Sequence, residues 1–338
     1  MLKKAMIMAA GVGSRLEPLS SVVPKPLVPL ANTPTMDILV KHLSSFGIKN
    51  IIANTYYKSE QIQEHYRNNQ FDINFRFIKE KELSGTAGGV KKCQFFFEEN
   101  EDFIIMSGDG LTDIDINKAY SSHKKSSSIV TIITKEVEHK DVSKYGIIVP
   151  DYKGFVESFQ EKPSLEDAKS NLANTGIYIF NYQIFKFIPQ NTFYDFAKNV
   201  FPSILNSGIK INTYTHTGYW SDIGSLEQYK QSNADIINNK VSSFTPQAIQ
   251  VQNGKYICGE NTTIGKNSII IGENVIGSNC FVGENCTITN SIIWDNVKIK
   301  DNVTIENSII LPNMTIEEPV CGEILSDNTN SNNIKISV

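Results

Sequence analysis

A glycine-rich segment near the start of the chain has residue types that suit polyphosphate binding. It reads Ala9-Ala10-Gly11-Val12-Gly13-Ser14-Arg15, and Lys25 follows between two prolines. Glycines let backbone N–H groups approach phosphate oxygens closely. The guanidinium of Arg15 can contact two such oxygens at once, and Lys25 adds a charge whose backbone the prolines restrict. The segment therefore predicts a loop that binds a triphosphate.

Two better-known glycine motifs do not fit this segment. A dinucleotide-binding fingerprint needs a third glycine where Leu16 stands and a helix that begins at once, which Pro18 and Pro24 disfavour. The sequence also has no GxxxxGK followed by Ser or Thr, so a Walker A loop is excluded. An ordinary glycine turn with surface charges remains the alternative, but it does not explain why Arg15 and Lys25 follow in series.

Two aspartates have surroundings that suit a divalent cation. Asp109 directly follows the apolar run Phe103–Met106, and Asp222 lies far downstream in Gly218-Tyr219-Trp220-Ser221-Asp222-Ile223-Gly224. In open α/β sheets ligands bind beyond the carboxyl ends of strands, and Mg²⁺ takes one or two carboxylates together with phosphate oxygens. We expect Asp109 and Asp222 to hold Mg²⁺; for Asp109 alone a turn or helix cap is the alternative. Asp113 and Asp115 are interpreted as caps or surface residues.

A third group of residues suits a sugar phosphate. Tyr145-Gly146, Glu161-Lys162-Pro163 and Asn174-Thr175-Gly176 follow one another along the chain. Glu161 and Asn174 could bind sugar hydroxyls, because hydroxyls pair with carboxylates and amides, and Lys162 could bind the phosphate. Each residue, taken alone, is also compatible with an ordinary surface or turn position.

Alternating strands and helices must position these residues up to about residue 235. Apolar runs predict strands at Lys4–Ala9, Asn50–Ala53, Ile73–Ile78, Phe103–Met106, Ile129–Thr134, Gly146–Val149, Thr175–Phe180 and Ile209–Thr215. The stretches between them predict helices at Thr35–Phe46, Ser59–Asn68, Ala87–Glu98 and Ile116–Lys124. This alternation is typical of an α/β, Rossmann-like, mostly parallel sheet covered on both faces.

Beyond residue 250 the sequence acquires a short period. Aliphatic residues recur six apart at Ile264, Ile270, Ile276, Val282 and Ile288, and then at five or six at Ile293, Ile299, Ile305, Ile310 and Ile316. A hexapeptide period is typical of a left-handed parallel β-helix, whose coils gain stability by stacking. A β-sandwich with ordinary alternating strands is the alternative. The predicted domains are 1–235, a linker over 236–250, a β-helix over 251–325 and a tail over 326–338.

Composition excludes several classes of protein. The net charge is −4 and the pI about 5.8, which argues against a bulk nucleic-acid binder. No apolar run approaches the length of a membrane span, and the short run at the start lacks a signal-peptide cleavage site. The five cysteines are odd in number and include no CxxC pair, so we expect neither a disulfide framework nor a zinc site. This fits a reducing compartment, and we expect a cytoplasmic protein.

The segment Gly11–Pro26 matches GxGxRxxPxxxxxPKP, and on this motif the chain resembles the sugar-1-phosphate nucleotidyltransferases, or nucleotide-sugar pyrophosphorylases. The resemblance extends over essentially the whole chain. It implies that Arg15 and Lys25 handle the triphosphate, that Asp109 and Asp222 hold Mg²⁺, and that Lys162 binds the sugar's phosphate. It also implies a nucleotide site at Ala9, Ala10, Gly11, Gly13, Ser14, Glu80, Gly85 and Thr86. It implies a sugar site at Tyr145, Gly146, Glu161, Asn174 and Thr175.

Within that family, Ser84–Gly88, Gly218–Gly224 and the β-helix are most similar to mannose-1-phosphate guanylyltransferases, although Ser107 replaces an Asn that many members carry. Uridylyl and thymidylyl members place a Gln where this chain has Glu80. A carboxylate only accepts hydrogen bonds, and guanine presents two adjacent donors, so Glu80 favours guanine. In the alternative, Glu80 faces solvent and Glu82 or the backbone contacts the base.

These features predict in-line attack of a sugar phosphate on the α-phosphorus of GTP, with mannose 1-phosphate as acceptor. One alternative is the same reaction with glucose or heptose 1-phosphate and another base. A second alternative is a catalytically inactive regulatory subunit that binds a nucleotide sugar. No histidine lies in the repeat region, which argues against a second, acyltransferase activity there. We expect the β-helix to make a homo-oligomer instead, with neither nucleic acid nor membrane as partner.

Overall fold

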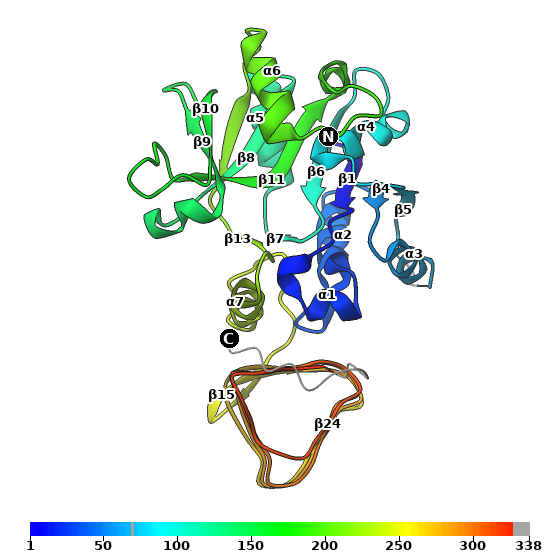
Figure 1. Ribbon diagram of the computed structural model, residues 1–338, viewed down its shortest axis with the longest axis vertical. Helices are drawn as coiled ribbons and strands as arrows, with labels where there is room; N and C mark the ends of the chain where they lie inside the picture. Colours follow the sequence, from blue (N-terminus) through cyan, green and yellow to red (C-terminus); the bar gives the residue numbers. More distant parts are fainter. Residues whose placement is uncertain (69–70, 327–338) are drawn as a thin grey trace. The chain divides into compact units, whose positions relative to one another are not determined.

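The computed structural model describes residues 1–68 and 71–326, which form two compact units (Figure 1). The first unit comprises Met1–Val12, Pro24–Leu27 and Met36–Asp222, and the second comprises Gly13–Val23, Val28–Thr35 and the chain from Ile223. None of the helices in these residues is long and apolar enough to cross a membrane. The expected domain boundaries stay predictions, and residues 327–338 of the expected tail lie outside the described residues.

The first unit is built on a sheet whose central strands are parallel. In order across the sheet, β6 (Asp102–Ser107), β1 (Lys4–Ala9), β4 (Asn50–Thr55) and β5 (Asn74–Lys79) run parallel. Beyond β6 the sheet continues with β11 (Leu172–Asn181), which is antiparallel to β6, β8 (Val130–Glu136) and β9 (Gly146–Pro150). β10 (Val156–Glu161) pairs with β9, and β12 (Asn212–His216) runs parallel to β8. The predicted mostly parallel α/β sheet is confirmed.

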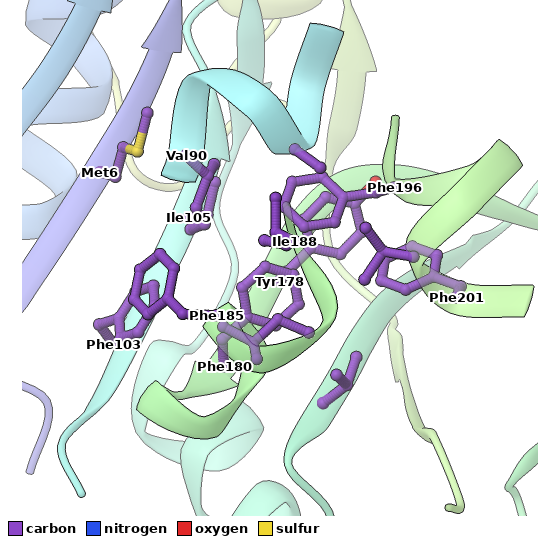
Figure 2. Packing of buried hydrophobic residues seen from close by; sticks show 14 of the residues in the cluster. Met6, Val90, Phe103, Ile105, Tyr178, Phe180, Phe185, Ile188, Phe196 and Phe201 are labelled. Carbon is purple, nitrogen blue, oxygen red and sulfur yellow. The ribbon is translucent and has the colours of Figure 1, made fainter. Parts of the chain in front are cut away.

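Helices cover both faces because the central strands are apolar on both sides. In β1, Met6 faces a core with α4 (Gly85–Lys92) and α6 (Phe201–Asn206), whereas Ala5 and Ile7 face the opposite core. That second core contains α2 (Thr35–Ser45), α3 (Ser59–Asn68) and α5 (Ile116–Ser126). Aromatic rings fill the first core, where Phe103 and Phe180 lie edge to face with centroids 6.1 Å apart (Figure 2).

One predicted helix is shorter than expected. The helix expected over Ala87–Glu98 is α4, which ends at Lys92, and a 3₁₀ turn follows at Gln94–Phe96. The reason is packing: the neighbouring residues Phe96 and Phe97 are both buried in the core, and a continued helix would separate their directions by about 100°. The sequence analysis missed β10, α6, and the short pair β7 (Gly110–Thr112) and β13 (Trp220–Asp222).

The second unit contains the predicted β-helix. Its coils stack in parallel, and each of the ten predicted aliphatic positions packs in one core, Ile264 as a partly buried member. The hairpin β14 (Ile249–Val251) and β15 (Asn253–Cys258) precedes the coils, which begin with β16 (Thr263–Ile264) and the long β17 (Ile269–Ile276). The remaining strands are β18 (Phe281–Val282), β19 (Thr287–Thr289), β20 (Ile292–Ile293), β21 (Lys298–Ile299), β22 (Thr304–Glu306), β23 (Ile309–Ile310), β24 (Thr315–Ile316), β25 (Val320–Cys321) and β26 (Ile324–Leu325).

Asparagines form the corners of these coils. Asn261, Asn267, Asn279, Asn285, Asn290, Asn296, Asn302, Asn307 and Asn313 have φ between 45° and 65°. This left-handed region is one that Asn tolerates better than most residues, which explains why Asn is abundant in the repeat. Asn261 donates to Asn279 one coil on, 18 residues later, whereas Asn285 donates to Asn302 17 residues later. The coil therefore shortens, which accounts for the change from steps of six to steps of five or six.

Helix α7 (Leu226–Ile237) packs against β15 and β17 in the same unit. The phenol of Tyr229 is buried and accepts a hydrogen bond of 3.0 Å from the indole N–H of Trp294. The segment with β2 (Pro29–Leu30) and β3 (Thr33–Pro34) joins this unit, because Asn32 donates to the carbonyl of Ile276 at 2.8 Å. The short helix α1 (Leu19–Val22) also belongs to it.

Candidate functional site

A cavity of about 360 Å³ lies in the first unit, where β1 and β6 end and α4 begins. Carboxyl ends of neighbouring parallel strands meet at one edge of a sheet, so segments far apart in the sequence converge there. The predicted site residues that line this cavity are Ala9, Ala10, Gly11, Lys25, Glu80, Gly85, Thr86 and Asp109.

Lys25 and Asp109 form an ion pair in the wall of this cavity. The ammonium of Lys25 contacts Oδ2 of Asp109, and the hydroxyl of Ser107 donates to Oδ1. The two charged side chains are only 12% and 22% exposed. Burial raises the pKa of Asp109, but the Lys25 charge and the Ser107 hydrogen bond outweigh burial and hold that pKa below its usual value. Asp109 is therefore ionised at neutral pH and faces the cavity with a cation beside it.

Asp222 reaches the same region through the pairing of two short strands. β13 lies beside β7 (Figure 1) and runs antiparallel to it. Asp222 lies directly opposite Gly110, the residue after Asp109. Opposite Cα atoms in such a pair are about 4.5–5.5 Å apart. No cluster of three or more metal-ligating side chains occurs among residues 1–68 and 71–326. Two carboxylates nevertheless fit Mg²⁺, which completes its shell with water and phosphate oxygens.

Glu80 lines the cavity and is almost fully buried, because only 3% of the residue is exposed. Oε1 accepts a hydrogen bond of 2.6 Å from the amide of Asn54, and Oε2 accepts from the Ser84 hydroxyl and, at 2.8 Å, from the Lys92 ammonium. A carboxylate offers about four acceptor positions. Protein donors therefore occupy most of them, and Glu80 does not face solvent.

The start of α4 is tied to a distant segment. Gly85 has φ +76°, and a Cβ there would lie 2.4 Å from the carbonyl oxygen of Tyr194, so only glycine fits. The same oxygen accepts the N–H groups of Ala87 and Gly88 at 3.0 and 3.1 Å. The hydroxyl of Thr86 donates to Asp195 at 2.8 Å. These groups shape the cavity wall, and their own hydrogen bonds are already made within the protein.

Part of the predicted sugar set lines a second cavity of about 450 Å³ in the first unit. Gly146, Glu161 and Asn174 meet there, from β9, β10 and β11. A Cβ on Gly146 would lie 3.2 Å from Oε2 of Glu161, so the glycine allows the carboxylate to approach the backbone. This cavity offers a carboxylate and an amide, as a sugar hydroxyl requires.

Tyr145, Lys162 and Thr175 are not among the residues that line that cavity. The Tyr145 ring lies edge-on to Trp220 at 5.3 Å, and burial together with the Asp222 charge raises the pKa of Tyr145 to about 12. The Thr175 hydroxyl donates to the carbonyl of Ile133 at 2.8 Å. Lys162 is exposed, with φ 45°, and its backbone N–H donates to Tyr145. Their roles in sugar binding stay predictions.

Gly13, Ser14 and Arg15 belong to the second unit. Gly13 has φ 77° and precedes a 3₁₀ turn, Ser14–Leu16, so the glycine is required by the backbone there. Leu16 is buried and Arg15 is exposed. The role of these three residues in triphosphate binding stays a prediction.

Two residues that line the first cavity, Asn54 and Asp195, escaped the sequence analysis, as did Lys92, which contacts Glu80. Asn54 had a detectable signal, because it is a polar residue that directly follows the apolar run Ile51–Ala53. Besides Glu80, it contacts the backbone N–H of Ala9 at 3.3 Å. Lys92 lies on a helix face with no distinguishing pattern, so only the fold reveals its contact with Glu80.

The chain matches two protein-family models. Residues 4–239 match the family described as nucleotidyl transferase, which is more than half of the chain. Residues 239–332 match the EIF2B subunit epsilon LbH domain, which agrees with the β-helix. Both parts of the predicted fold class are thus confirmed.

The relatives of this chain include proteins whose names differ in base and in sugar. A UTP–glucose-1-phosphate uridylyltransferase of Synechocystis is 32% identical, covering 85% of this chain and 82% of the relative. A glucose-1-phosphate adenylyltransferase of Mycoplasma mobile is 32% identical, with 80% and 85% covered. A mannose-1-phosphate guanylyltransferase of Mycobacterium tuberculosis is 26% identical, with 81% and 74% covered.

Among solved structures, HddC from Yersinia pseudotuberculosis in complex with GMP-PN is similar to this chain. The two are 27% identical and superpose with a TM-score of 0.60, which covers 69% of this chain and 98% of HddC.

Proposed function

Because this chain belongs to the nucleotidyl transferase family, whose sugar-1-phosphate nucleotidyltransferases it resembles over most of its length, we propose that it transfers GMP from GTP to mannose 1-phosphate. The products are GDP-mannose and pyrophosphate. The observation that carries nucleotidyl transfer is the Lys25–Asp109 pair in a cavity where two parallel strands end. It supplies one positive group for phosphate and one carboxylate for a metal.

In the proposed reaction, a phosphate oxygen of the sugar phosphate attacks the α-phosphorus of GTP. A new P–O bond forms, the bond between the α-phosphorus and the bridging oxygen breaks, and pyrophosphate leaves with the electron pair. The sugar phosphate is mostly a dianion at neutral pH, since its second pKa is about 6, so no general base is needed. The protein therefore acts by positioning and by stabilising charge.

The role proposed for each residue follows from the charge of its side chain and from its position in the structure or the family motif. Lys25 neutralises negative charge that develops on the departing pyrophosphate, and Arg15 is proposed to do the same. Lys162, which is exposed at the end of β10, is proposed to hold the attacking phosphate. Asp109 and Asp222 would hold Mg²⁺. When bound, that ion supplies positive charge to the reacting phosphates.

Guanine is proposed for the base from the resemblance to the guanylyltransferases. Glu80 lines the cavity, and three protein donors leave its carboxylate about one acceptor position, which a donor of guanine can use as well as one of uracil. The N1–H or amino group of guanine can donate to it. The similarity to HddC, whose structure was solved with GMP-PN, adds support.

A second candidate is uridylyl transfer to glucose 1-phosphate. It is favoured by the Synechocystis relative, which is more similar to this chain than the mannose-1-phosphate guanylyltransferase is, at 32% against 26% identity. The N3–H of uracil is also a single donor that one carboxylate position can accept.

The test is pyrophosphate release from purified protein with GTP, UTP, ATP and dTTP, each paired with mannose, glucose and heptose 1-phosphates. We expect kcat/KM to be highest for GTP with mannose 1-phosphate. A maximum for UTP with glucose 1-phosphate would replace the first assignment by the second. No pyrophosphate release from any pair, by protein that is folded by circular dichroism, would refute nucleotidyl transfer.

A further inference from the structure

Asp113 directly follows β7, although its sequence suggested only a cap or surface residue. Its carboxylate Oδ1 accepts the backbone N–H of Tyr219 at 2.6 Å and contacts Nε2 of His216 at 3.1 Å. Its own backbone N–H donates to the carbonyl of Tyr219 at 3.2 Å. The side chains of Asp113 and His216 are 9% and 7% exposed. Asp113 and Tyr219 are thus joined by two hydrogen bonds across a long stretch of sequence.

Further groups hold the same turn. Lys135 donates to the carbonyl of Gly218 at 2.6 Å and to that of Thr217 at 3.3 Å. The hydroxyl of Thr112 donates to the carbonyl of Tyr219 at 3.1 Å. A Cβ on Gly218 would lie 2.2 Å from Oδ1 of Asp113, so this glycine permits the close approach. We call Thr112, Asp113, Lys135 and His216 the turn clamp.

The clamped turn leads directly into β13, which carries Asp222. Tyr219 is followed by Trp220, and β13 then pairs with β7 so that Asp222 lies opposite Gly110. Since β7 ends at Thr112, the residue before Asp113, the same short stretch carries Asp109 at one end and the clamp at the other. The clamp therefore fixes the register that places the two aspartates beside each other.

We propose that Asp113 is a positioning residue for the metal site: it holds the turn at Tyr219 so that Asp222 and Asp109 can bind one Mg²⁺. This inference rests on the proposed function, because it requires that the two aspartates bind a metal with the triphosphate. Asp113 itself lines no cavity that contains Lys25 or Asp109, and its carboxylate is used by the turn. Its effect must therefore pass through Asp222.

The test compares Asp113→Ala with Asp113→Asn and with the matched control Asp115→Ala. Asp115 lies two residues away and caps α5 by accepting the N–H of Lys118 at 3.0 Å, so its loss should lower stability without touching the turn. GTP binding is measured by calorimetry with Mg²⁺ and again with EDTA. The readout is the factor by which Mg²⁺ tightens binding.

We expect the factor by which Mg²⁺ tightens GTP binding to be roughly tenfold smaller in Asp113→Ala than in the wild type, which is the effect of one hydrogen bond to a charged group. GTP binding in EDTA should be unchanged. Asp113→Asn should keep most of it, because an amide oxygen can still accept from Tyr219. If Asp113→Ala does not fold, Lys135→Met is used instead, because it removes two other hydrogen bonds to the turn. The factor by which Mg²⁺ tightens GTP binding should then be roughly threefold smaller than in the wild type. Asp115→Ala should match the wild type.

Two results would overturn the inference, and they differ in meaning. If the wild-type protein binds GTP no more tightly with Mg²⁺ than with EDTA, the metal site is refuted, and the proposed function is refuted with it. If Mg²⁺ tightens GTP binding in the wild type, and by the same factor in Asp113→Ala and Lys135→Met, the positioning role of the turn clamp alone is refuted.

Discussion

Replacing Lys25 with Met tests the charge at the centre of the proposed site. Met has nearly the length of the lysine stem but no ammonium, so the substitution removes the partner of Asp109 and the positive charge facing the cavity. If Lys25 neutralises the pyrophosphate that departs, the loss should fall on kcat more than on KM, because this charge develops in the transition state.

The size of the effect follows from the burial of the pair. Two unit charges 4 Å apart interact by about 4 kcal/mol at an effective dielectric constant of 20, which suits a side chain that is only 12% exposed. A loss of that size would lower kcat by roughly 10³-fold. A bound Mg²⁺ would share the same developing charge, so we expect a decrease of roughly 10²-fold.

The assay is steady-state pyrophosphate release with the best substrate pair, and the matched control is Lys49→Met. Lys49 pairs with Asp72 on the surface, where the two side chains are 53% and 86% exposed, so its loss should leave kcat unchanged. Circular dichroism and urea unfolding show whether Lys25→Met is folded, since it leaves Asp109 without its cation. A folded Lys25→Met protein with wild-type kcat would refute the assigned role.

The remaining predictions concern pH and the coil corners. The value of kcat/KM for the sugar phosphate should fall below about pH 6, where its dianion is protonated, and Ser107→Ala should not move this limb. The pKa of Asp109 is depressed below 3.8, so its ionised form is lost only as pH falls through that lower value. A limb near pH 6 that shifts with Ser107→Ala would contradict this, because that limb would then belong to Asp109 and not to the sugar phosphate. At Asn302, where φ is 64°, replacement by Ala should cost about 1–2 kcal/mol of unfolding free energy in urea titration, and replacement by Gly much less; equal costs would argue against strain at the corner.

Strands and helices buried in the first unit could be predicted because their residue patterns are local. β1 at Lys4–Ala9 and α3 at Ser59–Asn68 have the predicted bounds. The elements that were missed are short or depend on partners: β7 and β13 have three residues each and exist only as a pair. Such pairing joins residues far apart in sequence, and no periodicity announces it.

In the β-helix too, part of the structure could be predicted from a local pattern and part could not. A period of six, and then of five or six, identified the stack, yet the last inward positions, Val320 and Leu325, were not predicted. They pair with Ile305 and Ile310 across a shorter coil, so the period that revealed the earlier positions no longer applied.

For the site, the position of Asp109 followed from a general rule, that ligands bind where parallel strands end. The residues that hold Asp222 in place did not, because Asp113 and His216 look like ordinary polar residues until β12 and β7 are brought together. Residue type showed which groups could bind phosphate or metal. The contacts that orient them arise only from the tertiary structure.

Glu80 illustrates why residue type cannot by itself assign the base. In the sequence its carboxylate offers acceptors for both donors of guanine. In the structure Asn54, Ser84 and Lys92 already donate to it, so about one acceptor position is left. One acceptor binds the N1–H of guanine and the N3–H of uracil equally well. Discrimination between these bases must then come from the second donor of guanine, its amino group, and from whatever carbonyl or side chain in the cavity accepts it.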